Sequence, residues 1–350
     1  MIVALTGSTG FLGSHLVPML VAKGHQVVAL VRPGAPKLTC PWLQLPGVRV
    51  VAASLDDAPV VAAAFSGCQA VIHVLAALTG DESAQRAVNV QGTQAVLSAM
   101  DVAGVHRLVG MSSLSVYAWD TLAAGDTLTE STPLETRPER RDVYARCKRE
   151  QDALFTAFGQ TSGRAAVVLR PGIFYGAKAG VPDPSGGLWN FALGRALGGR
   201  AWLLMGPMGR HSDVPMVHIE DVSLGVVAAL ALLERPDACG AQVFNLVEAP
   251  APRRDELVAA LNRLAPARRL LTVPWPLHLG LARVATALAG WLPGGAARLP
   301  GLLHSSSLWA RHAPVHVDGT RARQLLGWQP RHQAIGVLQA LPPTTPDPLP

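Results

Sequence analysis

The amino-acid sequence predicts an α/β protein built on a doubly wound parallel sheet, with a smaller and mostly helical lobe toward the C-terminus. Two observations carry this prediction. Short apolar runs alternate with amphipathic segments through the first half of the chain, and a turn with three glycines follows the first apolar run. Strands that alternate with helices form βαβ units, which build a parallel sheet through right-handed crossovers. The 350 residues are enough to bury a full core.

Hydrophobic periodicity gives the individual elements. Strands are expected at 1–6 (MIVALT), 25–31 (HQVVALV), 49–54 (RVVAAS), 70–76 (AVIHVLA), 107–113 (RLVGMSS) and 165–172 (AAVVLRPG). Helices are expected at 12–23, 59–65, 87–104 and 142–160. After Gly172 the pattern loosens into a Gly- and Pro-rich loop at 176–187, and 214–233 then resembles a strand and helix that return to the sheet.

The turn TGSTGFLG lies between the first strand and the first helix, with glycines at Gly7, Gly10 and Gly13. In this context the first glycine makes the tight turn, the second lets backbone N–H groups approach a pyrophosphate, and the third lets the helix pack on the strand. The helix N-terminus then directs its dipole at the phosphates. The turn therefore predicts a dinucleotide site in a Rossmann domain.

The residue that ends the second strand indicates which dinucleotide is bound. An acidic residue there would bind the ribose hydroxyls of NAD, whereas this strand ends LVRPG, with Arg32 at that place. A guanidinium suits a 2′-phosphate through charge-assisted hydrogen bonds. The sequence therefore favours NADP, with NAD as the other possibility, since a solvated surface arginine is the alternative interpretation of Arg32.

The segment YARCK places Tyr144 and Lys148 four residues apart on one face of a predicted helix. A tyrosine works as an acid or base near neutral pH only if its pKa is lowered, and a neighbouring ammonium lowers it by stabilising the phenolate. The preceding strand ends MSS, and a serine hydroxyl there can hydrogen-bond the substrate oxygen that Tyr144 protonates. Lys148 is one of four lysines in the chain.

Composition excludes several classes of function. Hydrophobic residues make up 49% and charged residues 15%, which is typical of a globular protein. The net charge of +6 is spread along the chain without a dense basic block, so no nucleic-acid partner is expected. The four cysteines are far apart and form no Cys/His cluster, so neither a metal site nor a disulfide framework is expected. The chain opens directly on a strand, which predicts a cytoplasmic location.

The segment 277–292 (LHLGLARVATALAGWL) is the longest apolar stretch. It is short for a transmembrane span and carries Arg283 in its middle, so no span is predicted. Two interpretations stay open: a buried helix of the lobe, or an amphipathic helix that contacts a membrane surface.

At this point the chain resembles a known family, the extended short-chain dehydrogenases/reductases, also called the NAD-dependent epimerase/dehydratase family. The resemblance covers about residues 1–339. The matching segments, in order, are TGSTGFLG, AVIHVLA, NVQGT, MSSLSVY, YARCK, RPGIFYG, VHIEDV and LLGWQP. Members of this family share the fold predicted above, and they often form homodimers by pairing the helices that begin here near Asn89 and Tyr144; a homodimer is therefore expected.

The resemblance assigns roles to residues. It implies that Ser113 is the catalytic hydroxyl beside Tyr144 and Lys148, that Ser112 lies beside the nicotinamide, and that Asn89 supports the cofactor end of the site. With the glycine loop and Arg32, the implied cofactor contacts are Gly7, Thr9, Gly10, Phe11, Leu12, Gly13, Arg32, Ser54, Leu55, Leu75, Ala76, Asn89, Ser112, Tyr144, Lys148, Pro171, Gly172 and Ile173.

The chain departs from the family pattern at several positions. Ser54 replaces an aspartate that contacts adenine, and Leu75 replaces the first alanine of the usual HLAA. Val214 stands where sugar-nucleotide enzymes tend to carry a phosphate-binding arginine, and Arg210 is out of register. Leu114 and Ser115 replace the Asp-Glu pair of the 4,6-dehydratases, so water elimination is not expected.

The predicted function is an NADP-preferring oxidoreductase that interconverts a ketone and a secondary alcohol on a largely apolar small molecule. The short segment 77–88 resembles the steroid-dehydrogenase and dihydroflavonol-reductase branches, and an apolar lobe with Trp275, Trp291 and Trp309 would suit such a substrate, although these tryptophans are equally consistent with core packing. The alternatives are a nucleotide-sugar epimerase with tightly bound NAD, and a non-catalytic cofactor-binding scaffold or sensor.

The expected organisation follows. Residues 1–175 form the dinucleotide-binding domain, to which 213–247 return. Residues 176–212 and 248–340 form the substrate-binding lobe, and 341–350 (PPTTPDPLP after Leu341) form a disordered tail because so many prolines allow neither a helix nor a strand ladder.

Overall fold

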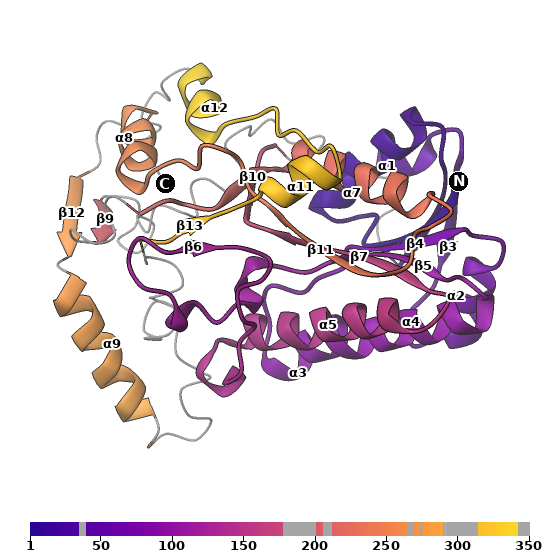
Figure 1. Ribbon diagram of the computed structural model, residues 1–350, viewed down its shortest axis with the longest axis horizontal. Helices are drawn as coiled ribbons and strands as arrows, with labels where there is room; N and C mark the ends of the chain where they lie inside the picture. The colour runs from indigo at the N-terminus through magenta and orange to yellow at the C-terminus, as the bar shows by residue number, and fades with distance from the viewer. Residues whose placement is uncertain are drawn as a thin grey trace.

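The computed structural model describes residues 1–34, 40–177, 201–205, 212–264, 269–273, 275–289, 291 and 314–341. Its centre is a parallel sheet of seven strands in the order β11-β7-β5-β4-β1-β2-β3 (Figure 1). The strands are β1 (Ile2–Thr6), β2 (Gln26–Val31), β3 (Val48–Ala52), β4 (Ala70–His73), β5 (Arg107–Met111), β7 (Ala165–Pro171) and β11 (Gly240–Leu246). The predicted doubly wound α/β fold is confirmed.

Helices cover both faces of the sheet, so the inner strands are buried on two sides, whereas the edge strand β3 has no fully buried residue. On one face lie α2 (Ala58–Phe65), α4 (Gly92–Ala103) and α5 (Val143–Gln160), with the short α3 (Glu82–Arg86) beside them (Figure 1). On the other lie α1 (Phe11–Ala22), α7 (Ile219–Leu233) and α11 (Thr320–Leu325). Val3, Leu5 and Ile72 belong to the core under the second set, whereas Ala4 and Val71 belong to the core under the first, because successive strand residues point to opposite faces.

The strands and helices of the first half match the predicted segments closely, and the largest difference is at 87–104. The structure has a π-helical turn at Ala87–Gln91 before α4 begins at Gly92. The packing of α5 on the sheet depends on glycine at position 110 of β5. A Cβ at Gly110 would lie 2.5 Å from the ring of Phe155 on α5. This close approach sets the depth at which α5 lies over the sheet.

Residues 213–247 return to the sheet by a different route from the one expected. The strand β10 (Met216–His218) pairs in parallel with β8 (Ile173–Tyr175) in a separate two-stranded sheet, and it is β11 that joins the main sheet, beside β7. The helix α7 connects β10 to β11 in the sequence, and it packs on α1. Gly172 allows the change of sheet, because a Cβ there would lie 2.3 Å from the Pro215 carbonyl oxygen.

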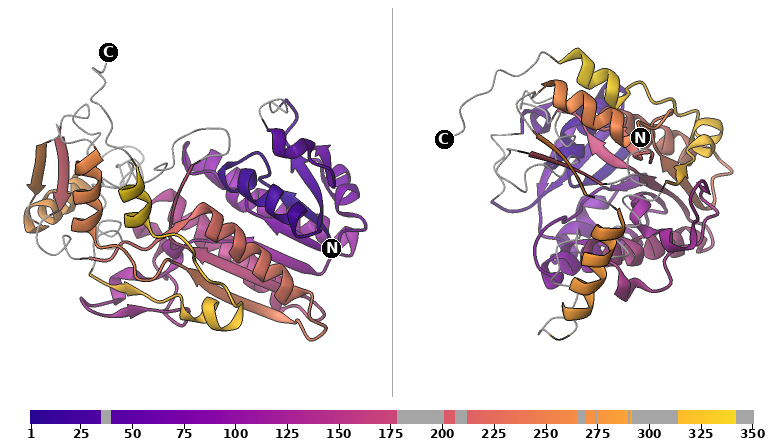
Figure 2. Two further views of the ribbon diagram at one scale, coloured as in Figure 1. Left: turned by 90° about the horizontal axis from the view of Figure 1, so that it is seen from above. Right: turned by 90° about the vertical axis from the view of Figure 1, so that its left-hand side faces the viewer.

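The remaining elements gather at the end of the molecule away from the N-terminus (Figures 1 and 2). They are α8 (Arg254–Leu264), α9 (Trp275–Ala289) and α12 (Ala334–Ala340), the strand pair β9 (Ala201–Met205) and β12 (Arg269–Val273), and the pair β6 (Thr127–Leu128) and β13 (His316–Val317). Leu257 and Leu261 of α8 and Leu338 of α12 pack on Tyr175 and Met216 of the small sheet. Among the described residues after Glu248 helices predominate, and the two strands there, β12 and β13, which the sequence did not predict, pair with β9 and β6.

The buried-helix interpretation of 277–292 is wrong for the residues that the structure describes. Leu277, Leu281, Val284 and Leu288 on α9 are 56–63% exposed, and Trp291 is 90% exposed, so Trp291 does not pack in a core either. The structure does not describe the side chain of Trp275, nor any part of Trp309. Most of the predicted loop at 176–187 and the tail beyond Leu341 also lie outside the described residues. All four cysteines are free.

Candidate functional site

The glycine loop lies at the point where the strand order reverses, between β1 and β4, which is where open α/β sheets bind ligands. Gly7 has φ +83°, and a Cβ there would lie 3.0 Å from the Leu75 nitrogen after β4. The Gly10 N–H donates to the Gly7 carbonyl at 3.0 Å. A Cβ at Gly13 would lie 2.4 Å from that carbonyl oxygen, so the first turn of α1 packs directly on the loop.

Two residues that the sequence analysis missed brace this loop. The buried Ser8 hydroxyl donates to the Leu30 carbonyl of β2 at 2.9 Å, and the Trp42 indole N–H donates to the Ser8 carbonyl at 2.9 Å. Nothing in the sequence indicates the Trp42 contact, because it joins segments with no shared periodicity. Hydrogen bonds to β2 and from the turn at Pro41–Gln44 therefore hold the loop in place. Thr9, Gly10 and Phe11 are at least partly accessible, whereas Leu12 and Gly13 are buried.

The expected adenosine-end residues follow the neighbouring strands. Arg32 directly follows β2 and its side chain is exposed. Ser54 follows β3, and its hydroxyl hydrogen-bonds Asp56 Oδ2 at 3.2 Å. Leu55 lies against Gly92, where a Cβ would be 3.1 Å from the Leu55 Cδ1 atom. Since the carboxyl ends of parallel strands share one edge, the structure places these residues on the same edge as the glycine loop.

Asn89 fixes the segment after β4. Its side-chain amide donates to the Ala77 carbonyl at 2.9 Å, and its carbonyl oxygen accepts from the Ala77 N–H at 2.8 Å. Asn89 is fully buried in the π-helical turn before α4. It therefore holds the stretch that contains Leu75 and the exposed Ala76 against the end of α4.

Ser113 and Tyr144 meet beyond the carboxyl end of β5. Asp142 caps α5 by accepting from the Ala145 N–H at 2.9 Å, and this cap places Tyr144 in the first turn. The Tyr144 hydroxyl and the Ser113 side chain are close enough to interact. Burial raises the pKa of Tyr144 to about 12, the Ser113 side chain opposes that shift, and the Asp142 charge adds to it. The expected lowering of the Tyr144 pKa by Lys148 is not present in this structure.

Lys148 lies one helical turn further along α5 and is 1% exposed. Its ammonium donates to the Met111 carbonyl at 2.8 Å and to Gln151 Oε1 at 2.7 Å. The Gln151 amide donates to Thr93 Oγ1 at 2.7 Å, and Thr93 Oγ1 donates to the Asn89 carbonyl at 2.8 Å. Burial lowers the pKa of Lys148 to about 7, against the opposing charge of Asp152.

The same chain of bonds reaches His73. Its Nε2 atom lies 2.9 Å from Thr93 Oγ1, and its Nδ1 atom lies 2.6 Å from Thr6 Oγ1. Because the Thr93 proton is already directed at the Asn89 carbonyl, the imidazole N–H must be on Nε2, and Thr6 donates to Nδ1. Burial lowers the pKa of His73 to about 3, and the Lys148 charge adds to this effect. His73 is thus a fixed, neutral connector between β1, β4 and α4.

The Ser112 side chain is directed into the interior. Its hydroxyl donates to Asp152 Oδ2 at 2.5 Å, and the same carboxylate accepts two hydrogen bonds from Arg170 at 2.8 and 2.7 Å. The guanidinium of Arg170 also lies 4.8 Å from the centre of the Tyr117 ring. A nicotinamide ring would therefore meet the backbone of Ser112 rather than its hydroxyl.

Pro171, Gly172 and Ile173 form the junction between β7 and β8. Pro171 is buried beside Leu246 in the sheet register, the Gly172 N–H donates to the Leu246 carbonyl at 3.0 Å, and Ile173 is 41% exposed. These residues lie on the same edge as Ser113. The structure thus brings the predicted residues to one edge of one sheet, in the order of the strands they follow.

The residues fit a dinucleotide. Gly7 has a positive φ and a Cβ at Gly13 would overlap the loop backbone, so the loop needs glycine at these two positions, and a Cβ at Gly10 would make a tight contact of 3.2 Å with the Gly7 carbonyl oxygen. Gly10 also precedes α1 without a side chain that could accept from the first-turn N–H groups. This arrangement leaves a positive helix end toward the loop, as a pyrophosphate requires.

Comparison with known proteins agrees with this geometry. The profile of the NAD dependent epimerase/dehydratase family matches residues 3–246. The chain belongs to this family. A 3 beta-hydroxysteroid dehydrogenase/Delta 5→4-isomerase of Mycobacterium tuberculosis is 35% identical over 184 residues, which cover 50% of this chain and 47% of that protein. The chain thus spans about half the length of the first curated relatives that it matches.

Other relatives match over almost their full length. A 3-diazoavenalumate denitrifying reductase of a Streptomyces species is 31% identical over 344 residues, or 94% of this chain and 96% of that protein. A solved UDP-glucose-4-epimerase of Stenotrophomonas maltophila, with bound NAD and formylated UDP-arabinopyranose, has a TM-score of 0.69 at 23% identity and covers 97% of this chain and 96% of its own. That structural likeness concerns the fold. Among the described residues, no helix is long and apolar enough to cross a membrane.

The burial of Lys148 predicts a pH dependence of stability. Its folded-state pKa of about 7 is below the ordinary lysine value of 10.5, so between these values the unfolded chain binds more protons than the folded protein. The free energy of unfolding of the wild type should therefore rise with pH relative to Lys148→Met, by at most about 1.4 kcal/mol per pH unit. Urea unfolding of both proteins at pH 7, 8 and 9 measures this difference. Curves that stay parallel would contradict the prediction.

Proposed function

We propose that this protein is an NADP-preferring oxidoreductase that interconverts a ketone and a secondary alcohol on a largely apolar small molecule. The observation that carries the proposal is the proximity of Ser113 and Tyr144 beyond β5, on the same sheet edge as the glycine loop and with Lys148 one turn along α5. Relatives named as a hydroxysteroid dehydrogenase and as a reductase support the reaction class.

The bound dinucleotide would supply a hydride at nicotinamide C4. The chain's own residues would do the rest. Ser113 would hold the carbonyl oxygen of the substrate, and Tyr144 would donate a proton to it as the alcohol forms. The raised pKa of Tyr144 keeps its hydroxyl protonated at neutral pH, which suits this direction of transfer. Lys148, which already has Met111 and Gln151 as partners, would bind the cofactor ribose.

Three positions argue against the other reactions of the family. Leu114 and Ser115 follow Ser113 directly, and neither side chain can act as the acid or base of a water elimination. Val214, where an arginine would hold a sugar-nucleotide phosphate, is fully buried, so the sugar-nucleotide epimerase alternative lacks that anchor. The epimerase alternative remains consistent with the family. The two reactions can be distinguished by which substrate the protein converts, an apolar ketone or a nucleotide sugar.

The deciding experiment combines purified protein with NADPH or NADH and a panel of apolar ketones, and separately with UDP-glucose. Oxidation of NADPH that depends on a ketone supports the proposal. Conversion of UDP-glucose without net cofactor turnover would support the epimerase, and cofactor binding without either reaction would support a scaffold or sensor. The chain offers a matched set of controls, because it has only three tyrosines.

Tyr144→Phe should lower kcat by about 10²–10⁴-fold, the usual contribution of general acid–base catalysis, because it removes the proton donor and little volume. NADPH affinity should stay within about threefold, since Lys148 is unchanged. Ser113→Ala should also slow turnover and spare the cofactor, whereas Lys148→Met should weaken both. Tyr175→Phe removes a buried hydroxyl of the small sheet and should leave kcat unchanged. Full kcat in Tyr144→Phe would overturn the mechanism.

Arg32 is proposed to bind the 2′-phosphate of NADP. Arg32→Ala should weaken NADPH binding by about 1.5–3 kcal/mol, the range for hydrogen bonds to charged groups, and leave NADH binding nearly unchanged. Calorimetric titration with both cofactors measures this. Arg235→Ala, which removes another exposed arginine, controls for the loss of net charge. Equal losses for NADPH and NADH would show that Arg32 does not read the phosphate.

We also propose a cytoplasmic homodimer that pairs α4 and α5 across a two-fold axis. These helices contact each other on one face of the sheet, and their exposed residues include the small or apolar Ser98, Val102, Ala153 and Ala157. Sedimentation velocity at micromolar concentration should give the mass of a dimer. A monomer at that concentration would count against this arrangement.

A further inference from the structure

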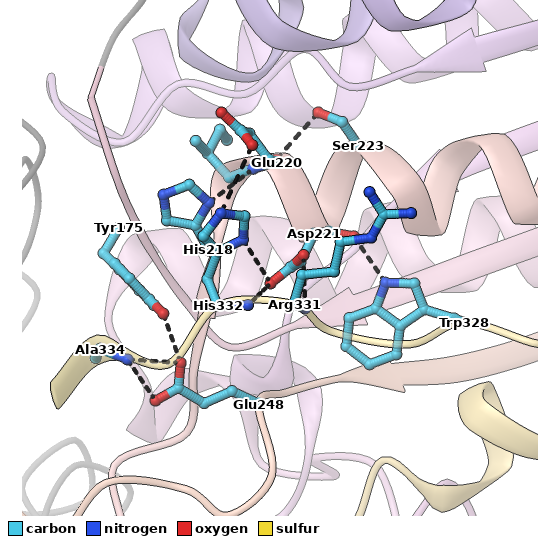
Figure 3. A network of polar contacts seen from close by, with 11 residues as sticks. Tyr175, His218, Glu220, Asp221, Ser223, Glu248, Trp328, Arg331, His332 and Ala334 are labelled. Atoms are coloured by element: carbon cyan, nitrogen blue, oxygen red, sulfur yellow. Dashed lines mark hydrogen bonds and ion pairs between the residues drawn. The ribbon is translucent and has the colours of Figure 1, made fainter. Parts of the chain in front are cut away.

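A cluster of two histidines and a glutamate lies outside the residues used above. His218 ends β10 and precedes α7, Glu220 lies in the first turn of α7, and His332 belongs to the segment that leads into α12 (Figure 3). One side-chain ligand atom from each of the three lies within 4.8 Å of the others. The sequence indicates no such group, because His332 is far along the chain from the other two.

The orientation of the His332 ring is fixed by Asp221. The Asp221 carboxylate is fully buried and accepts from the backbone N–H groups of Arg331 and His332, both at 3.0 Å. Its Oδ2 atom also lies 3.2 Å from His332 Nδ1. A carboxylate has no proton to give, so Nδ1 carries the hydrogen and donates it. This leaves a lone pair on Nε2, which lies 3.7 Å from Glu220 Oε2.

The His218 ring is held on both sides. It stacks on His332 with 3.9 Å between ring centroids, and the edge of Tyr175 approaches it at 5.1 Å. The Nδ1 atom of His218 accepts a long hydrogen bond of 3.3 Å from the Glu220 N–H, so its lone pair is directed at that N–H, and an ion bound at Nδ1 would take the place of this bond. Gly176 makes room for the ring, because a Cβ there would lie 2.7 Å from His218 Nε2.

From this geometry we propose that His218, Glu220 and His332 bind a divalent transition-metal ion, with Asp221 as the residue that orients His332. Imidazole nitrogens with one carboxylate suit zinc, cobalt, nickel or copper, whereas magnesium and calcium prefer all-oxygen sites. A carboxylate that accepts from the non-ligating nitrogen of a histidine is the usual outer partner of such a ligand. Three protein ligands leave one position for water or another donor.

The ligand atoms lie up to 4.8 Å apart and must move closer to hold an ion, and the stacked rings of His218 and His332 must tilt, because an ion lies in the plane of each imidazole ring that binds it. Bonds of about 2.0–2.1 Å to a tetrahedral ion bring neighbouring ligand atoms to roughly 3.4 Å from each other. The Glu220 side chain is 49% exposed and can move toward the two rings. The N-terminus of α7 disfavours a cation nearby, and the negative charges of Glu220 and Asp221, both in its first turn, offset that field.

An ion here would join two parts of the chain. His218 and Glu220 belong to β10 and α7, while His332 lies between Trp328, whose indole N–H donates to the Asp221 carbonyl, and Ala334, whose N–H donates to Glu248 (Figure 3). The metal would therefore fasten the C-terminal segment to the core beside the small sheet. Its expected effect is to stabilise the folded protein, whether or not it alters turnover.

The test uses the 350-residue protein without an affinity tag, in a Cys239→Ser background, because Cys239 is an exposed thiol and thiolates are metal ligands. Titration with Co²⁺, followed by its visible absorption, and calorimetry with Zn²⁺ should each show one site per chain. Zn²⁺ should also raise the melting temperature. His332→Ala and Glu220→Gln should weaken binding by at least about tenfold and remove the thermal shift.

His106→Ala removes an exposed histidine far from the cluster in the sequence and should leave Co²⁺ and Zn²⁺ binding as in the parent protein. The failure of either cluster variant to weaken binding would assign the ion to another site and overturn the proposal. The absence of a one-to-one site in the parent protein would also overturn it. Both Glu220→Gln and His332→Ala keep the buried Asp221 bonds to backbone N–H groups, so the fold remains testable.

Discussion

A buried ammonium group constrains much of the interior. Lys148 is almost fully enclosed, and an unpaired charge in that environment would be very costly. Its protons therefore go to the Met111 carbonyl and to Gln151, and Gln151 passes the chain of hydrogen bonds to Thr93. Through His73 the chain ends at Thr6. One network thus ties α5 to β5, α4, β4 and β1, and it does so at the edge of the sheet where the proposed site lies.

The next turn of α5 carries a second buried charge with a different partner. Asp152 follows Lys148 by four residues and so lies on the same side of the helix. Its carboxylate is paired in a two-point contact with Arg170 of β7 and also accepts from Ser112. Breaking such a pair leaves an uncompensated charge, so these residues constrain one another strongly. The two networks together fix how α5, β5 and β7 meet, and so where Ser113 and Tyr144 are held.

The opposite side of the same sheet edge is organised around Asp221 of α7. Its buried carboxylate accepts from the backbone of the segment before α12, and its carbonyl accepts from Trp328. The C-terminal segment is therefore attached to the Rossmann core through backbone hydrogen bonds, and not only through apolar packing of α8 and α12 on the small sheet. The proposed metal site lies at this junction, where a single bound ion could strengthen the attachment of the C-terminal segment.

The sequence by itself determined the alternation of strands and helices, the glycine turn, and the spacing of Tyr144 and Lys148, because these depend on local periodicity and on backbone geometry within a few residues. It predicted the sheet and which residues lie at its carboxyl edge. Tertiary structure alone decided the inward direction of Ser112, the raised pKa of Tyr144, the brace of Trp42 and the pairing of β10 with β8. Each of these depends on burial or on a contact between segments distant in the chain, and neither hydrophobic pattern nor motif spacing records which buried polar group finds which partner.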